Sequence, residues 1–456
     1  MSTDRLVPRV RLRMAVAVVV SLAALVALAG CGSKSSSSTS TSTSASSGGS
    51  SSTGSSTSTG ASASTGTSSC GPKPGVKATG SPIVLGAINT KQPGTDFTDQ
   101  PNMEQAYFDC VNANGGVNGH VVKLIGLTDQ TQPAQIAADA HQLIQTDHVV
   151  GLSGNSDILE CTIDHSYWEK LGAFVIGAGI APECYSTPNI ADVNMGPRFS
   201  SDGAVQYGLA QHPSKMVFVQ SNVPGTGYIA AGPTALAKAA NVPITALTEN
   251  VPINDANSIA LDLVNKAGSN GWVVLNFTPP EALVILQAAQ KLGLENRVKG
   301  WGCSTPCDTD FLATALGPKW NHKLFVNAEL APPDVTNTPT MSLYKGILKQ
   351  YGKKVTGGIG SFSQMGFLQG EIAVHALQNM KGPYTFKSVN DAFHSIKAYD
   401  TGMLCQPWTF GNYSLHIANN TDYTVTPENG KMVLAQGCTA ISSVDPQIAA
   451  YHKVAG

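Results

Sequence analysis

Residues Met103–Leu127 read MEQAYFDCVNANGGVNGHVVKLIGL. Apolar residues recur at helical spacing in the first half, which predicts a helix over Met103–Asn114 with one buried face. Gly115-Gly116 then ends the helix, because glycine readily adopts the left-handed conformation found just after many helices. The apolar run Val121–Leu127 is typical of a buried parallel strand. The stretch therefore predicts a helix, a tight turn and a strand, the repeating unit of an α/β fold.

The same alternation continues on both sides of this stretch. Ile83–Ile88 predicts the first strand, and Pro133–Thr146 predicts a helix with one apolar face. Further strands are expected at His148–Leu152, Ala173–Ile176, Met216–Gln220, Trp272–Phe277 and Leu324–Val326. Further helices are expected at Thr234–Ala240, Ser258–Lys266 and Glu281–Leu292. Strands and helices in this order form right-handed βαβ units, and two sheets suit the length of the chain better than one.

The N-terminus carries an export pattern. Arg5–Arg13 is basic, and the uncharged apolar run Met14–Ala29 follows it. This run has the length of a signal-peptide core and is short for a membrane span. It ends in Leu28-Ala29-Gly30-Cys31, which resembles the bacterial lipobox, in which the cysteine is acylated and becomes the mature N-terminus. We therefore predict a lipoprotein signal peptide over residues 1–30 and lipidation of Cys31; an ordinary N-terminal membrane anchor is the alternative.

The composition after Cys31 is that of a tether. Residues 35–69 are only Ser, Thr, Ala and Gly, which cannot bury enough apolar surface to offset their conformational entropy. Residues 31–80 are therefore predicted to be a flexible Ser/Thr/Gly-rich linker, although such stalks can also carry O-linked sugars. The folded region is expected on the extracytoplasmic face of the cell membrane, attached through the N-terminal lipid.

The remaining residues, 81–456, are long enough for two lobes, and 42% of the chain is hydrophobic, which is enough to build cores. Charged residues make up only 13%, and the formal net charge is −2. A mildly acidic chain with few charges is poorly suited to phosphate backbones, so nucleic-acid binding is not expected.

The nine cysteines also fit an exported protein. Lipidation of Cys31 leaves eight, and an even number in an oxidising compartment suggests disulfides. We expect neighbours in the sequence to pair, as Cys70–Cys110, Cys161–Cys184, Cys303–Cys307 and Cys405–Cys438. The alternative is zinc binding at Cys303-Ser-Thr-Pro-Cys307, but no second thiol pair or nearby histidine completes a four-ligand set, so no metal is predicted.

Val111-Asn-Ala-Asn-Gly-Gly-Val-Asn-Gly-His120, followed by Val121–Leu124, resembles a motif of the type I periplasmic solute-binding proteins. These are proteins of the leucine/isoleucine/valine-binding kind that serve ABC importers, and the motif spans the end of their first helix, a tight turn and the second strand. Supporting similarity lies in Thr128-Asp129 before the alanine-rich helix at Pro133, in Ala178–Glu183 and in the helix Gly366–Leu377. The resemblance covers essentially the whole of residues 81–456.

The resemblance implies two Rossmann-like α/β lobes with parallel-sheet cores, joined by a three-segment hinge. The expected lobes are residues 81–200 with 331–401 and residues 201–330 with 402–456. The chain would then cross between the lobes near Ser200, Ala331 and Thr401. A ligand that contacts both lobes favours their closed arrangement.

In open parallel sheets, ligands bind beyond the carboxyl ends of the strands, where helix N-termini offer unpaired N–H groups. In this sequence, loops of small and polar residues directly follow several of the predicted strands. Gly, Ser and Asn are what any such turn needs, so a role in turn formation is the alternative to a role in binding. With the resemblance, the expected ligand-binding residues are Ser153, Asn155, Ser156, Ala178, Gly179, Ile180, Pro224, Thr226, Phe277, Thr278, Cys303 and Phe362.

Three of these residues depart from the pattern of the family's amino-acid binders. Those proteins often carry Ser or Thr where Ile180 stands, an aromatic residue near Pro224 and an acidic residue near Cys303. A hydroxyl and a carboxylate hold the amino group of the ligand, which Ile and Cys do poorly. The resemblance implies an amino acid as the solute, and these departures make an amide or another small amphipathic compound an equal expectation.

Catalysis and cofactor binding are not expected. The sequence has no Walker A loop, no G-x-S-x-G elbow and no H-E-x-x-H motif, and Gly225-Thr-Gly227 lacks the spacing of a dinucleotide fingerprint. The predicted function is capture of a small solute by a monomer that delivers it to an ABC permease. The alternatives are a ligand-sensing receptor subunit of the same fold and a surface protein that binds a macromolecule.

Overall fold

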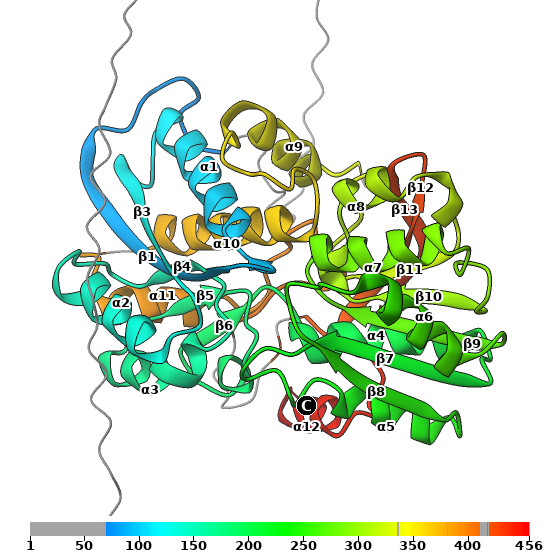
Figure 1. Cartoon of the computed structure of the whole chain (residues 1–456). Helices are drawn as coiled ribbons and strands as arrows, with labels where there is room; N and C mark the ends of the chain where they lie inside the picture. The colour runs from blue at the N-terminus through cyan, green and yellow to red at the C-terminus, as the bar shows by residue number, and fades with distance from the viewer. Residues whose placement is uncertain (1–69, 335–336, 381, 411–416, 418, 456) are drawn as a thin grey trace, which may run out of the picture. The chain divides into compact units, whose positions relative to one another are not determined.

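The computed structural model describes residues 70–455 apart from 335–336, 381, 411–416 and 418 (Figure 1). The predicted signal peptide and Cys31 lie outside the described residues, as does the predicted tether up to residue 69. None of the helices within the described ranges is long and apolar enough to cross a membrane.

The first of two β-sheets has six strands in the order β2-β1-β4-β5-β6, with β3 also paired to β1. All of these pairs are parallel except that of β1 with β2. The strands are β1 (Gly80–Gln92), β2 (Thr95–Asp96), β3 (His120–Asp129), β4 (Leu152–Asn155), β5 (Val175–Gly177) and β6 (Ile190–Asp192).

Helices cover both faces of this sheet, which is why β1 is a nearly continuous apolar run. On one face α1 and α10 pack together, with the rings of Tyr107 and Phe367 5.1 Å apart. On the other face, α2 and α3 enclose a second core around Trp168. The helices of this unit, the first lobe, are α1 (Asp99–Ala113), α2 (Pro133–Gln145), α3 (Glu160–Leu171), the 3-10 helix η1 (Pro182–Tyr185), α9 (Pro339–Tyr351), α10 (Ser361–Gln378) and α11 (Phe386–His394).

The second sheet has seven strands in the order β13-β12-β11-β10-β9-β7-β8. The five strands from β7 to β11 pair in parallel, and β12 and β13 add an antiparallel edge. The strands are β7 (Lys215–Ser221), β8 (Ile244–Glu249), β9 (Gly271–Asn276), β10 (Gly300–Cys303), β11 (Leu324–Ala328), β12 (Thr421–Glu428) and β13 (Lys431–Ala440).

Helices also enclose the second sheet and complete the second lobe. One face buries a core that includes Trp301 and Trp320, and the other buries Trp272. Gly300 is required next to this ring, because a Cβ at that position would collide with the Trp272 side chain. The helices are α4 (Gly196–Ala210), α5 (Ala231–Ala239), α6 (Ala256–Ala267), α7 (Pro279–Lys291), η2 (Thr305–Cys307), α8 (Asp310–Leu316), η3 (Pro318–Trp320) and α12 (Pro446–Ala455). Two α/β lobes with mainly parallel sheets confirm the predicted fold class.

The chain passes between the lobes three times. The first crossing lies between β6 and α4, slightly before the expected Ser200, because α4 (Gly196–Ala210) packs on β9, β10 and β11 of the second sheet. The second lies between β11 and α9 and includes the expected Ala331.

The third crossing lies later in the chain than the expected Thr401. Met403, Leu404, Trp408 and Phe410 pack in the core of the first lobe, so residues 402–410 belong to the first lobe and not to the second. Trp408 is held there because its Nε1–H donates to the Asp192 carbonyl at 3.2 Å.

Eight cysteines form four disulfides in the structure: Cys70–Cys110, Cys161–Cys184, Cys303–Cys307 and Cys405–Cys438. The first two lie within the first lobe, and the third lies within the second. Cys405 lies between Leu404 and Trp408, which pack in the first core, whereas Cys438 lies in β13, so the fourth disulfide joins the two lobes.

Candidate functional site

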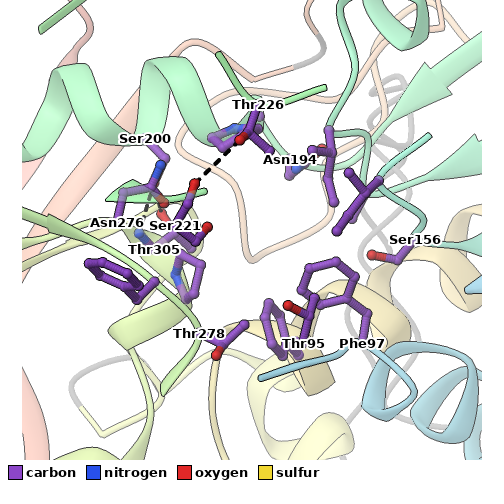
Figure 2. Close-up of a pocket in the computed structure, with 18 of the residues that line it drawn as sticks. Thr95, Phe97, Ser156, Asn194, Ser200, Ser221, Thr226, Asn276, Thr278 and Thr305 are labelled. Carbon is purple, nitrogen blue, oxygen red and sulfur yellow. Dashed lines mark hydrogen bonds between the residues drawn. The ribbon is translucent and has the colours of Figure 1, made fainter. Parts of the chain in front are cut away.

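A pocket lies between the lobes, beyond the carboxyl ends of β4, β5, β7, β9 and β10 (Figure 2). It encloses about 750 Å³ of empty space, part of which is open to solvent. The loops that follow strands of both sheets line this pocket. A molecule held there would therefore contact both lobes.

The first lobe contributes a mainly apolar wall. Ile158 and Ile180 pack near Phe97 and Phe362, whose rings meet edge to face at 5.4 Å. This wall is assembled from separate parts of the sequence, because Phe97 follows β2 whereas Phe362 lies in the first turn of α10. A solute with an apolar body gains free energy by leaving water for such a surface.

The second lobe contributes a more polar wall. Ser221 ends β7, Asn276 ends β9 and Thr305 follows β10, and Figure 2 shows these side chains around the same space. Thr226 closes its own turn, because its hydroxyl donates to the Val223 carbonyl at 2.7 Å. Hydroxyls and amides of this kind fix the orientation of a ligand that the apolar wall attracts.

A directed chain of hydrogen bonds runs from this wall into the second sheet. Asn327 Nδ2 donates to Asp422 Oδ2, so its Oδ1 faces Thr305 as an acceptor. The Thr305 hydroxyl donates to Asn327 Oδ1 at 2.6 Å, and the Ser200 hydroxyl donates to Thr305 Oγ1 at 2.9 Å.

Glu329, just after β11, also lines the pocket. Burial raises the pKa of its carboxyl to about 7, while the Met195 N–H and the nearby hydroxyls of Thr305 and Ser200 lower it. The Met195 N–H donates to Glu329 Oε2 at 2.8 Å. Glu329 is therefore a buried carboxyl that titrates near neutral pH and faces the space between the lobes.

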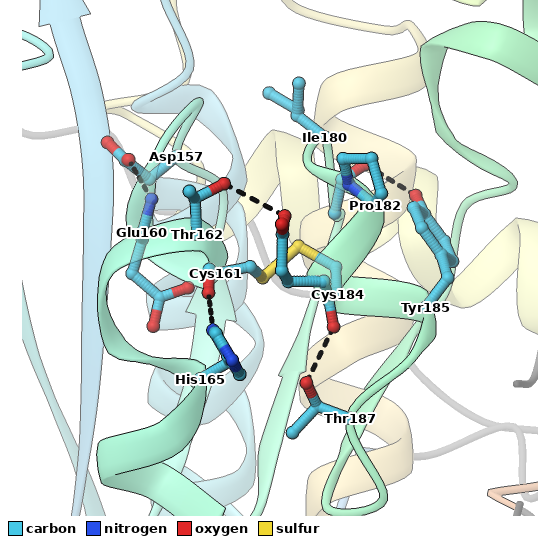
Figure 3. The surroundings of a disulfide bond; sticks show 12 residues. Asp157, Glu160, Cys161, Thr162, His165, Ile180, Pro182, Cys184, Tyr185 and Thr187 are labelled. Carbon is cyan, nitrogen blue, oxygen red and sulfur yellow. Dashed lines mark hydrogen bonds between the residues drawn. A yellow bond between two sulfur atoms is a disulfide. The ribbon is translucent and has the colours of Figure 1, made fainter. Parts of the chain in front are cut away.

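Two disulfides brace pocket loops, one in each lobe. Cys161 at the start of α3 is bonded to Cys184 in η1, beside the loop that carries Ala178 and Ile180 (Figure 3). The Tyr185 hydroxyl donates to the Gly179 carbonyl at 2.6 Å and fixes the same loop. In the second lobe, Cys303–Cys307 closes a short loop around Thr305 and Pro306, both of which line the pocket.

Hydrogen bonds also join the lobes around the pocket. The Tyr228 hydroxyl of the second lobe donates to the Ile180 carbonyl of the first. The Thr278 hydroxyl donates to the Gly94 carbonyl at 2.9 Å. These contacts would be lost if the lobes separated.

The structure brings together seven of the twelve residues expected to bind a ligand. Those that line the pocket are Ser156, Ala178, Ile180, Thr226, Phe277, Thr278 and Phe362.

The other five lie outside the lining, and each has a structural role or an outward position. The Ser153 hydroxyl donates to Glu104, and Asn155 Oδ1 accepts the Ile88 N–H at 2.7 Å. The Gly179 carbonyl accepts hydrogen bonds from the side chains of Tyr185 in η1 and Asn194 after β6. Pro224 is exposed, and Cys303 is fully buried in its disulfide.

Several lining residues were not predicted from the sequence. Asn276 lay inside the predicted strand Trp272–Phe277, and β10, which Thr305 follows, was not predicted, so the rule of polar groups after strands did not reach either residue. Asn194 and Glu329 come from the crossings and Ser200 lies in α4, and no local pattern marks these residues as part of a site. The remaining unpredicted polar residues in the lining are Thr95, Gln100 and Ser221.

The described residues contain no group of His, Cys, Asp and Glu side chains arranged to hold a metal ion. The sulfurs of Cys303 and Cys307 are bonded to each other.

Two α/β lobes joined by three crossings, with a pocket between them, define the class of the type I periplasmic binding proteins. A family model described as periplasmic binding protein matches residues 76–431, and the chain belongs to this family. Comparison with curated protein sequences gave no significant match.

Solved structures share the fold at low sequence identity. A branched chain amino acid ABC transporter protein from Thermus thermophilus with bound valine has a TM-score of 0.72 and 16% identity, over 80% of this chain and 98% of that one. A fatty acid ABC transporter substrate-binding protein from Thermomonospora curvata has a TM-score of 0.68 and 18% identity, over 82% and 97%. A solute binding protein from R. palustris in complex with 4-hydroxybenzoate has a TM-score of 0.65 and 12% identity, over 79% and 97%.

Proposed function

We propose that this protein is a lipid-anchored, extracytoplasmic solute-binding protein that captures a small amphipathic molecule between its lobes and delivers it to an ABC permease. The observation that carries the proposal is the pocket itself, because its lining comes from both lobes and combines an apolar wall with a polar one. The compared structures from Thermus thermophilus and R. palustris hold valine and 4-hydroxybenzoate, which are both small molecules.

The residues proposed to bind the solute are those of the lining. Phe97, Ile180 and Phe362 would contact its apolar part, and Asn276 and Thr305 would contact its polar part. Hydrogen bonds between the lobes, such as that of Tyr228, would then favour the closed arrangement once the solute fills the space.

A thermal-shift screen of the purified protein tests solute capture. The panel should contain amino acids, amides, amines, alcohols, small aromatic compounds and carboxylates. A ligand at about 100 times its Kd stabilises the folded state by roughly 2.7 kcal/mol, which raises Tm by several degrees. A reproducible shift for one chemical class supports capture and names the class, whereas flat traces from folded protein would favour a sensor or macromolecule-binding role.

The anchor is tested separately in cells. Cys31→Ser removes the proposed acylation site, so the protein should move from the membrane fraction to a soluble fraction. Retention of the Cys31→Ser protein in the membrane would favour an uncleaved N-terminal anchor instead.

A further inference from the structure

The negative charge that the pocket lining can carry comes from one side chain, Glu329. Among the described residues that line the pocket, Glu329 is the single ionisable group, and no Lys, Arg or His is present. The residue is only 2% exposed. A carboxylate in such a position is stable only if hydrogen-bond donors or a cation replace the water it has lost.

Three groups of the protein interact with this carboxylate. The Met195 N–H donates to Oε2, and the hydroxyls of Thr305 and Ser200 lie close enough to lower the pKa of the carboxyl by hydrogen bonding. A carboxylate has about four lone-pair sites, so Glu329 retains capacity to accept a hydrogen bond from the pocket side.

We propose that Glu329 accepts a hydrogen bond from the head group of the solute, and that the solute is therefore an apolar body with an N–H or O–H donor, neutral or cationic, and not a simple carboxylate anion. This inference rests on the proposed function and deepens it. The body would lie against the wall of Phe97, Ile180 and Phe362. An anionic head group next to Glu329 would place two like charges together in a partly dehydrated space with no cation in the described lining.

Glu329 is also the residue at which the three crossings meet. It belongs to the second crossing, and its carboxylate accepts the N–H of Met195 in the first. Its carbonyl accepts a hydrogen bond at 2.8 Å from Nδ2 of Asn419, which lies just before β12 in the third. A donor that reaches this carboxylate therefore contacts the hinge directly, which links recognition of the head group to the position of the lobes.

A series of probes that differ only in head group tests the proposal on the wild-type protein. Phenethylamine and phenylacetamide carry donors, methyl phenylacetate is neutral without a donor, and phenylacetate is an anion. Their affinities are measured by calorimetry at about pH 8, above the pKa of Glu329. Because hydrogen bonds to charged groups are the stronger kind, a donor-bearing probe should bind about 10- to 100-fold more tightly than the ester and the anion.

Glu329→Gln is the matching variant, because it keeps the shape and an acceptor for Met195 but removes the charge. It should reduce the preference of the amine over the ester by about tenfold or more. Glu371→Gln is the control, since it alters another buried carboxyl, on α10, outside the pocket lining. Folding of both variants is checked by circular dichroism.

Two results would overturn the proposal. One is phenylacetate binding as tightly as the amine or the amide, and the other is an unchanged preference in Glu329→Gln. Absence of binding by all four probes also counts against it, while the broad screen described above decides separately whether the protein captures any solute.

Discussion

Asp192 at the end of β6 offers a sharp test of the electrostatics behind the pocket loop. Its side chain is buried, and this burial raises the pKa to about 8, while the Gly179 N–H lowers it. The negative charge of Asp192 also helps to raise the pKa of the neighbouring Glu160. Because the pKa is higher in the folded state than in the unfolded state, folding takes up a proton, and the stability that this provides is lost as pH rises toward 8.

The substitution Asp192→Asn replaces the carboxyl by a neutral amide of the same shape. One extra proton bound by the folded state corresponds to about 1.4 kcal/mol per pH unit, or about 3–4 kcal/mol between pH 5 and pH 8. Other buried carboxyls contribute to both proteins alike, so the difference in free energy of unfolding between wild type and variant should change by this amount over that range. A cost of the new amide that does not depend on pH lowers the variant's free energy of unfolding equally at every pH. The comparison therefore uses only the slope of the free energy of unfolding against pH.

Urea unfolding at half-unit steps from about pH 5 to pH 8 provides the measurement, with the free energy of unfolding in water as the readout. The variant should gain stability relative to wild type as pH rises. Parallel curves for the two proteins would refute the reasoning, because they would mean that Asp192 does not take up a proton on folding.

Three other changes probe the pocket and the hinge. Phe362→Ala removes part of the apolar wall and should weaken binding of an identified solute by about 1.5–3 kcal/mol in calorimetry; unchanged affinity would exclude this wall from the site. Tyr228→Phe deletes the hydrogen bond to Ile180 and should destabilise the closed arrangement by about 1 kcal/mol. The variant should then bind the solute more weakly and have a larger radius of gyration in its presence. Values identical to those of wild type would mean that the bond does not hold the lobes together. Replacing both Cys405 and Cys438 by Ser should cost about 2–4 kcal/mol in denaturant unfolding under oxidising conditions, because the bond closes a loop with a sequence separation of 33; equal stability would show that it provides no restraint.

The sequence predicted elements well where hydrophobic patterns were strong. The helix expected at Met103–Asn114 is α1, which begins earlier because Pro101 is tolerated in a first turn. The edge strand β8 (Ile244–Glu249) was missed, since it is only half buried and has no continuous apolar run. Helix α4 was missed for a different reason: it buries Ser200, Ser201 and Asp202, so its buried face is not apolar.

The site was predictable only in part, for a related reason. Loops after strands could be identified locally, which is how Ser156, Ala178 and Thr226 were found. The strand was expected to end at Leu152, but β4 continues to Asn155, so Ser153 and Asn155 lie in the strand and bond to buried groups of the first lobe. Glu329 reaches the pocket because the three crossings converge, which is a property of the assembled fold and not of any segment.

The disulfide between Cys405 and Cys438 makes the third crossing part of a closed covalent ring. A single cut by a protease between these residues would therefore release no fragment, because β13 and α12 would stay attached through sulfur to the rest of the chain. The cut protein would run as one band on a gel without reductant and as two bands after reduction. Within the described residues, the third crossing is the only one of the three that a disulfide also spans. A break in its backbone therefore leaves the C-terminal part of the second lobe covalently attached.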